Sequence, residues 1–232
     1  MSDTMYKQGE YLEKNPTWHE EDSPWKAGKI LAMLKKNNIQ PKTVCEVGCG
    51  AGEILNQMLQ QMPDTVEFTG YEISPQAYEI AKKKEQDRLH FKLQDIAEDK
   101  DASFDVVMAI DVFEHIEDYM EFLRMLKNKG TYQVFHIPLD ISTQAQVRRT
   151  PLKKVRKDVG HIHLFTKQTA LAALRAAGYE VLDTSYTAGT IDLPSKSLLS
   201  AMARLPRKLL FSLNKNLAVR LLGGHSLLVL TK

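Results

Sequence analysis

A short apolar segment followed by three closely spaced glycines constrains this chain most strongly. Residues 43–47 predict a buried β-strand, Gly48, Gly50 and Gly52 predict a turn, and residues 53–61 predict a helix. Glycine lets the backbone approach a ligand closely, and the start of a helix offers free backbone N–H groups. The sequence therefore predicts a strand–turn–helix unit of the kind that cradles a nucleotide-like ligand.

The residues at this turn argue against two familiar phosphate sites, although an ordinary β–α turn stays open as an alternative. A dinucleotide site needs the pattern G-x-G-x-x-G, and Glu53 stands where the third glycine should be. Its carboxylate would also repel a pyrophosphate, and the Gly-Lys-Ser/Thr ending of a phosphate loop is missing. Glu46, near the end of the strand, instead suits a ligand without phosphate that carries an ammonium and a sulfonium.

Acidic residues also follow the next predicted strands. Glu72 ends the second strand, 20 residues after Gly52, where a carboxylate can accept hydrogen bonds from both hydroxyls of a ribose. Asp95 and Ile96 follow the third strand, and Asp111 follows the fourth. Because ligands of open α/β sheets lie outside the carboxyl ends of the strands, these positions should meet in one site.

This glycine turn and these acids resemble motif I and the strand ends of the class I S-adenosylmethionine-dependent methyltransferases, of the small-molecule type. The resemblance covers residues 25–186 and 223–231 and implies S-adenosyl-L-methionine as the cofactor. In that family the acid after the third strand accepts a hydrogen bond from the adenine amino group, and the next backbone N–H meets a ring nitrogen. The expected cofactor contacts are Glu46, Gly48, Gly50, Gly52, Glu72, Ile73, Asp95, Ile96 and Asp111.

The order of the predicted elements indicates the α/β fold class. They follow one another as β-α-β-α-β-β-α-β-α-β, and a last strand comes after a long connection. This order fits the seven-stranded, Rossmann-like methyltransferase sheet, whose last strand the resemblance implies to be antiparallel. We expect a single methyltransferase domain over residues 1–232, an N-terminal arm over 1–24, and cap insertions over 138–165 and 187–222 on the acceptor side.

The two cap insertions differ in their patterns. Residues 138–165 show no clear regular element. In the second insertion, Pro206 is expected to separate two short amphipathic basic helices. We predict that these helices cover the site as a lid and bury their leucines against the sheet, and peripheral contact with an anionic membrane surface is the alternative.

A helix is predicted directly after the N-terminal arm. Ser23 is its expected N-cap, Pro24 fits the first helical position, and the helix should run to about Lys36. Lys26 is expected to be solvated, although the resemblance leaves open a contact with the cofactor's methionine carboxylate. The aromatic residues of the arm, among them Trp18, indicate that it docks on another surface.

Charge and composition limit the partners and the cellular compartment that the sequence predicts. Residues 1–139 carry 16 Lys and Arg against 24 Asp and Glu, whereas residues 140–232 carry 15 against 5. The basic run over 148–157 can meet an anionic acceptor or form a solvated loop, and without interleaved aromatic residues it gives little support to nucleic-acid binding. No stretch suits an integral membrane segment, and two cysteines without a signal peptide predict a cytoplasmic protein.

Two histidines are the candidate catalytic residues. His115 belongs to the run Asp111-x-x-Glu114-His115, which follows the fourth strand, where the transferable methyl should point. His161 lies in the first cap insertion, where it and His163 alternate with apolar residues. A neutral imidazole can take the proton of an acceptor hydroxyl near neutral pH.

The same run is similar to the Glu-x-x-Glu-His metal motif of some methyltransferases of RNA ends and of quinone precursors. His161 or His163 would complete such a set, because residues at i, i+3 and i+4 share one face at a helix start. Aspartate in the first place departs from the metal-binding pattern, and we expect Asp111 to face the cofactor. The prediction is therefore a metal-independent site with no metal ligands.

These features predict an S-adenosylmethionine-dependent methyltransferase whose small-molecule acceptor carries a hydroxyl, as in a sugar, a lipid-linked or a quinone-like compound. The alternative enzyme is an RNA methyltransferase whose basic C-terminal face tracks phosphates. A non-enzymatic cofactor-binding or NAD-binding domain is a third reading, and Glu53 argues against NAD.

Overall fold

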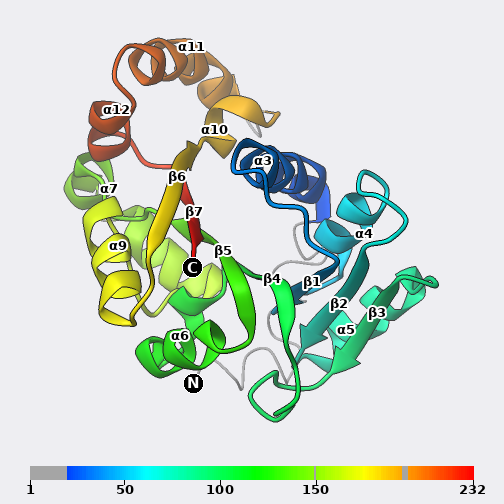
Figure 1. The fold of residues 1–232 in the computed structure, drawn as a ribbon. Coiled ribbons are helices and arrows are strands. Elements are labelled where there is room, and N and C mark those ends of the chain that lie inside the picture. Colours follow the sequence, from blue (N-terminus) through cyan, green and yellow to red (C-terminus); the bar gives the residue numbers. More distant parts are fainter. Residues whose placement is uncertain (1–19, 149, 195–197) are drawn as a thin grey trace.

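The computed structural model describes residues 20–148, 150–194 and 198–232, which surround one seven-stranded sheet (Figure 1). Neighbouring strands are parallel except where β7 lies antiparallel between β5 and β6. The predicted seven-stranded, Rossmann-like fold with an antiparallel last strand is confirmed. In sheet order the strands are β3 (Leu89–Leu93), β2 (Glu67–Glu72), β1 (Thr43–Val47), β4 (Phe104–Ile110), β5 (Gly130–Pro138), β7 (Ser226–Thr231) and β6 (Val181–Thr187).

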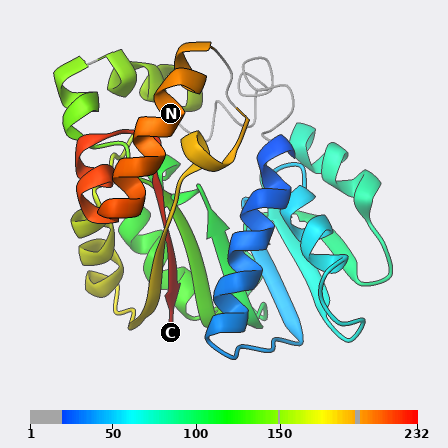
Figure 2. The same ribbon diagram turned by 90° about the horizontal axis from the view of Figure 1, so that it is seen from above.

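Helices cover both faces of this sheet (Figures 1 and 2). Residues of α3 (Ser23–Lys36), α4 (Glu53–Leu59) and α5 (Pro75–Ala81) share an apolar core on one face. Residues of α6 (Tyr119–Lys127) and α9 (Lys167–Ala176) share a second core on the opposite face. This three-layer arrangement leaves the carboxyl ends of the parallel strands open for a site.

The central strand β4 shows why this sequence forms a sheet that is buried on both faces. Val106 and Met108 belong to the core under α3 and α4, whereas Val107 and Ala109 belong to the core under α6 and α9. All four are fully buried, because successive side chains of a strand point to opposite faces. A continuous apolar run is therefore what a central parallel strand requires.

The two predicted cap segments lie above the carboxyl ends of the parallel strands, where Figure 2 shows α11 in orange. The elements after β5 are α7 (Thr143–Arg148), α8 (Thr150–Lys154) and a π-helix (Val155–Val159). Those between β6 and β7 are α10 (Gly189–Asp192), α11 (Leu198–Leu213) and α12 (Lys215–Leu221). In the described part of the chain, no helix combines the length and the apolar character needed to cross a bilayer.

Two predictions of local structure are wrong at helix starts. The segment 138–165 contains regular helices, because Ser142 opens α7 by accepting a hydrogen bond from the backbone N–H of Ala145 at 3.2 Å. At α3 the N-cap position belongs to Asp22, since the 3₁₀ turn Glu20–Asp22 runs directly into the helix. The arm residues before Glu20, with Trp18, lie outside the described residues.

The predicted break at Pro206 is also wrong. Pro206 lies inside α11 and is exposed, so water can bond to the helical carbonyl that loses its N–H partner. The chain breaks instead at Asn214, whose side chain caps α12 by accepting from the N–H of Leu217 at 3.0 Å. The leucines of α11 were expected to be buried against the sheet, but Leu205 and Leu209 are exposed.

Candidate active site

A cavity of about 2040 Å³ lies at the carboxyl ends of β1, β2, β4 and β5. One part of its wall comes from the glycine turn and the residues after β2 and β3. The other part comes from both cap segments, which contribute Asp140, His161 and Arg207 among others. A pocket for one small ligand measures roughly 300–1,000 Å³, so this cavity has room for a cofactor and an acceptor side by side.

The glycine turn after β1 closes as the sequence predicts. The backbone N–H groups of Gly48 and Cys49 both donate to the carbonyl of Tyr71, at 2.8 and 3.1 Å. Gly48 and Gly50 have positive φ angles and line the cavity. Gly52 also has a positive φ but does not line the cavity. A Cβ there would lie 2.4 Å from the ring of Phe91, so Gly52 serves close packing.

Glu72 ties this turn to the end of β2. One of its carboxylate oxygens accepts from Gly50 N at 2.8 Å, and the other accepts from Ile73 N and Ser74 N at 2.9 and 2.8 Å. Burial raises the pKa of Glu72, while these backbone N–H groups act in the opposite direction. Glu72 and Ile73 line the cavity, and the carboxylate oxygen that accepts from Gly50 N has only this one bond within the described residues and can also accept a hydroxyl.

The residues after β3 complete this part of the wall. Asp95 and Ile96 both line the cavity, and Ile96 is fully buried. The side chain of Asp95 accepts from Ala97 N at 2.9 Å, and Gln94 N donates to the carbonyl of Glu72 at 3.0 Å. These bonds fix the loop, so its backbone presents a defined edge to a flat ring system.

Glu46 places an unusual carboxyl group on the cavity wall. It is buried, and within the described residues its Oε2 atom has no hydrogen-bond partner. Burial raises the pKa of Glu46 to about 8, although nearby Lys26 lowers it. A buried, unpartnered carboxyl oxygen is costly unless a ligand satisfies it, and a cationic ligand suits it best.

Asp111 belongs to a buried polar chain that the sequence only partly indicates. Its carboxylate lies 2.7 Å from Lys26 Nζ and 2.6 Å from His136 Nδ1, and His136 Nε2 lies 2.8 Å from the hydroxyl of Thr187. The Lys26 ammonium and the His136 imidazole outweigh burial and hold the pKa of Asp111 far below its usual range. The expectation of a solvated Lys26 is wrong. Asp111 lines the cavity, with its carboxylate committed to these partners.

The two predicted catalytic histidines meet on the cavity wall. The rings of His115 and His161 lie 4.8 Å apart, and both line the cavity. His161 Nδ1 lies 2.7 Å from the carboxylate of Asp140, so this acid orients the imidazole. His163 instead lies with its Nε2 3.0 Å from the carbonyl of Ile116 and does not line the cavity.

Glu114 stands beside both histidines. Its Oε1 atom lies 3.9 Å from His115 Nε2 and 4.0 Å from His161 Nε2. It is fully buried, and within the described residues neither carboxyl oxygen has a hydrogen-bond partner. Burial raises the pKa of Glu114 well above its usual range and lowers that of His115 to about 4. At neutral pH His115 is therefore uncharged, and it is a weaker base than its sequence position predicts.

These three residues are the candidate metal ligands of the site. Their ligand atoms all lie within 4.8 Å of one another, and Asp111 is not part of the group. A carboxylate with two imidazoles is a donor set that zinc and other first-row divalent ions accept. Burial by itself favours the protonated form of Glu114, whereas a bound cation would favour the carboxylate, so the cluster is compatible with either state.

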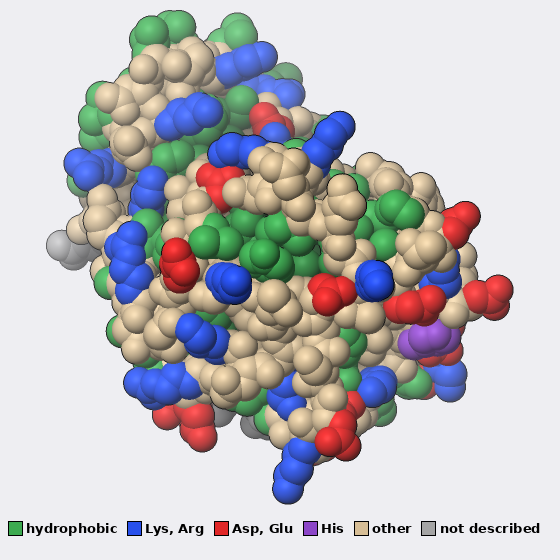
Figure 3. Space-filling view, viewed as in Figure 1, with side chains coloured by type: hydrophobic (Ala, Val, Ile, Leu, Met, Phe, Trp, Pro, Cys, Tyr) green, Lys and Arg blue, Asp and Glu red, His purple; other side chains and the backbone are tan. Residues whose placement is uncertain are grey.

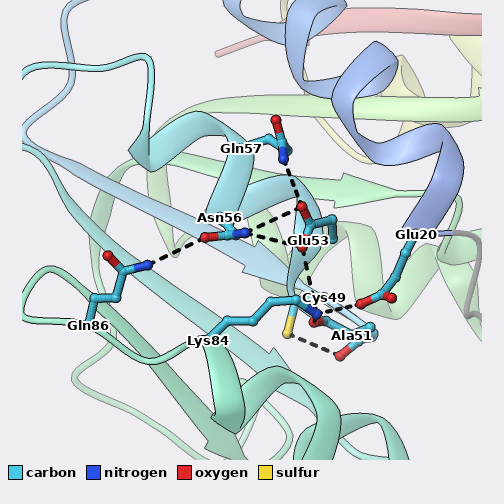
Figure 4. A network of polar contacts seen from close by, with 9 residues as sticks. Glu20, Cys49, Ala51, Glu53, Asn56, Gln57, Lys84 and Gln86 are labelled. Atoms are coloured by element: carbon cyan, nitrogen blue, oxygen red, sulfur yellow. Dashed lines mark hydrogen bonds and ion pairs between the residues drawn. The ribbon is translucent and has the colours of Figure 1, made fainter.

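Two features of the site were missed by sequence reasoning. Lys84 donates to the carbonyl of Ala51 at 2.7 Å and pairs with Glu20 and Glu53, which fastens the glycine turn to the start of α3 (Figure 4). The second feature is Asp140, which lines the cavity. It follows the end of β5, and a position after a strand end is the sequence signal that could have revealed it. Both contacts join distant parts of the chain, so local spacing could not reveal them.

Known proteins resemble this chain over most of its length. A family model described as "Methyltransferase domain" matches residues 18–184, more than half of the chain. The plantazolicin methyltransferase BpumL, solved with a monoazolic desmethylPZN analog and SAH, has a TM-score of 0.64 at 16% identity, over 99% of this chain and 92% of that chain.

Two further solved structures share the fold at low sequence identity. Magnesium protoporphyrin IX methyltransferase from Synechocystis PCC 6803 has a TM-score of 0.60 at 14% identity, over 90% of this chain and 83% of that chain. The cyclopropane synthase MmaA2 from Mycobacterium tuberculosis has a TM-score of 0.60 at 16% identity, over 88% and 82%. With the family match, this chain belongs to the class I S-adenosylmethionine-dependent methyltransferases.

Proposed function

We propose that this enzyme methylates a hydroxyl group of a small-molecule acceptor, with His161 as the general base. The observation that carries the proposal is the Asp140–His161 pair on the wall of the cavity, with 2.7 Å between the carboxylate and Nδ1. A carboxylate on Nδ1 holds the proton there and leaves Nε2 free to accept the proton of a hydroxyl.

The cofactor lies across the glycine turn in this proposal. Gly48 and Gly50 let the backbone approach it, Glu72 accepts from its ribose hydroxyls, and the loop with Asp95 and Ile96 meets its adenine. Glu46 is placed to face its cationic methionine end. All of these residues line the same cavity, which supports one continuous binding mode.

The proposed methyl transfer uses the acceptor hydroxyl, the cofactor and His161. The acceptor oxygen attacks the methyl carbon in line with the sulfur, the carbon–sulfur bond breaks, and S-adenosylhomocysteine leaves. The hydroxyl proton passes to Nε2 of His161. His115 stays neutral, because its pKa is lowered to about 4, and acts on the acceptor side by contact. We propose that this step needs no metal, since His161, oriented by Asp140, already supplies the base.

The acceptor side of the cavity supports a small molecule with both polar and apolar parts. Leu139 and Leu193 line it together with Arg148 and Arg207. We regard residues 138–165 and 187–222 as caps of one domain, and we place the enzyme in the cytoplasm, where its free thiols Cys45 and Cys49 would stay reduced. Among the similar structures, one is named for methylation of magnesium protoporphyrin IX and one for methylation of plantazolicin.

The test is methyl transfer from isotope-labelled cofactor to a panel of sugars, lipid-linked compounds and quinone-like phenols. We expect a methyl ether as the product, identified by mass spectrometry, and loss of turnover in His161→Ala with cofactor binding retained. Products methylated only on nitrogen or carbon would contradict the proposal. Transfer to RNA that falls steeply between low and moderate salt would favour the RNA methyltransferase instead.

A further inference from the structure

Helix α11 carries a stripe of apolar residues on the outside of the molecule. Its outer stripe follows helical spacing, and these side chains are between 62% and 85% exposed. Such a stripe normally faces the core of a globular protein. The stripe consists of Leu198, Met202, Leu205, Leu209 and Leu213.

The opposite side of α11 holds the helix to the domain by polar contacts. Arg204 Nε donates to the carbonyl of Ile191 at 2.6 Å, and Arg207 donates to the carbonyl of Gly223 at 2.7 Å and to Gln144 Oε1 at 3.0 Å. These bonds fix the rotation of the helix about its axis. The outward stripe is therefore a consequence of specific contacts on the inner side.

The apolar surface continues beyond α11. Leu217 and Leu221 on α12 are exposed, and so is Val147 on α7, which packs against α12. Figure 3 shows hydrophobic side chains at this end of the molecule, with Lys and Arg among them. We give the name outer leucine face to the surface that consists of the α11 stripe, Leu217, Leu221 and Val147.

Basic side chains border the outer leucine face. Residues 193–232 contain no Asp or Glu. The exposed side chains Lys208, Lys215 and Arg220 lie on α11 and α12, and the exposed Lys153 and Lys154 lie on α8. An apolar helix face with basic residues beside it is the pattern of helices that lie in the interface of an anionic bilayer.

We propose that the outer leucine face docks on the surface of an anionic lipid bilayer. Charge decides between a bilayer and a second copy of the chain as the occupant. A symmetric contact would lay this face of one copy on the same face of another and so gather Lys208, Lys215 and Arg220 of both copies in one interface, whereas anionic lipid headgroups neutralise them. This inference does not depend on the methyl-transfer chemistry.

Docking would place the cavity next to the bilayer. Ser200, Ala203 and Arg207, on the inner side of α11, line the cavity. One helix therefore separates the acceptor site from the outer leucine face. An acceptor whose apolar part rests in the bilayer could reach the cavity around this helix, which gives the proposed docking a role in acceptor delivery.

The experiment is co-sedimentation of the full chain with vesicles. One set contains phosphatidylglycerol in phosphatidylcholine and the other contains phosphatidylcholine alone. We expect sedimentation with the anionic vesicles, and a loss of roughly tenfold or more in apparent affinity for Leu205→Ser with Leu209→Ser. Lys208→Ser with Lys215→Ser should weaken binding and reduce its dependence on salt.

Matched controls separate docking from loss of folding. Leu182→Ser changes an exposed leucine on β6, and Lys35→Ser with Lys100→Ser removes exposed charges elsewhere, so both should sediment as the unchanged chain does. Retained thermal unfolding and retained S-adenosylhomocysteine binding in every variant confirm the fold. Equal binding to both vesicle types, absent binding, or binding unaffected by the leucine changes would overturn the proposal. The proposal would also be overturned if the chain does not bind vesicles and analytical ultracentrifugation shows a dimer that the leucine changes dissociate.

Discussion

The carboxylate of Asp140 lies 2.7 Å from Nδ1 of His161, and these two residues come from opposite ends of the first cap segment. Asp140 lies two residues after the end of β5, close to the sheet, whereas His161 follows the π-helix. The pair brings an oriented imidazole to the wall of a cavity that reaches the glycine turn. It is the arrangement on which the proposed catalysis rests.

We expect His161→Ala to lower turnover by ~10²–10⁴-fold with nearly unchanged cofactor affinity, because a general base acts only in the chemical step. Asp140→Asn should lower turnover by roughly 10-fold or more, since an amide can hold the wrong imidazole tautomer. Single-turnover rates and calorimetric titration with S-adenosylhomocysteine measure the two effects. His163→Ala is the matched control, because His163 does not line the cavity. Full turnover in His161→Ala and in Asp140→Asn would mean that positioning of the acceptor alone suffices, without a base.

Glu72→Ala should weaken S-adenosylmethionine binding by about 1.5–3 kcal/mol, as expected for lost charged hydrogen bonds. The change also removes the acceptor for three hydrogen bonds, which the backbone N–H groups of Gly50, Ile73 and Ser74 donate to the carboxylate. Calorimetry measures the affinity, and Glu67→Ala, at the exposed start of β2, is the control. Unchanged affinity in Glu72→Ala would remove Glu72 from the cofactor site.

Gly52→Ala should destabilise the fold by about 2–4 kcal/mol, because a Cβ would overlap Phe91 and because the φ of 75° is unfavourable for alanine. Gly28→Ala is the matched control, since nothing lies within 4 Å of a Cβ at that helical position. This control should leave stability unchanged or raise it by about 0.5–1 kcal/mol. Denaturant unfolding of both variants measures the difference, and equal stability would contradict the packing role of Gly52.

The buried carboxyl group of Glu46 predicts a specific pH dependence of stability. Its pKa is raised from 4.5 to about 8 in the folded chain, so between these values the unfolded chain has released a proton that the folded chain keeps. Its contribution to stability is full below about pH 4.5 and is lost as the pH rises through about 8.

The variant Glu46→Gln cannot ionise, so its stability should not share this loss. Between pH 5 and pH 8 the difference in unfolding free energy should shift in favour of the variant by up to a few kcal/mol, because one unit of pKa shift corresponds to ~1.4 kcal/mol. Thermal unfolding of the cofactor-free enzyme at both pH values measures this. Glu67→Gln, at an exposed position, should show no such gain. A constant difference between Glu46→Gln and the unchanged chain across this range would show that Glu46 does not titrate there.

Exhaustive chelation should leave methyl transfer unchanged, because the proposed step uses His161 as its base and routes nothing through a cation. The assay compares turnover before chelation, after it, and after addition of magnesium or zinc. Activity that is lost to the chelator and restored by a metal would establish Glu114, His115 and His161 as ligands, and would overturn the metal-free mechanism.

Local sequence determined the core of the fold and the cofactor-facing turn. The glycines after β1, the acids at the ends of β2 and β3, and the continuous apolar run of β4 follow rules of spacing that act within a few residues. The predicted strand 43–47 matches β1, and the acids expected after the second and third strands stand at the ends of β2 and β3. Positions of this kind depend on the local backbone, and therefore the sequence carries them by itself.

Tertiary structure alone decided which side chains meet and which face solvent. Lys26 and Asp111 stand 85 residues apart in the chain, and only the packing of α3 over the end of β4 joins them in an ion pair. The same holds for the outward leucines of α11. Their spacing is the same whether the stripe faces the core or the solvent, and the inward contacts of Arg204 and Arg207 choose the rotation of the helix. Periodicity sets which residues share a face, and long-range contacts set the direction in which that face points.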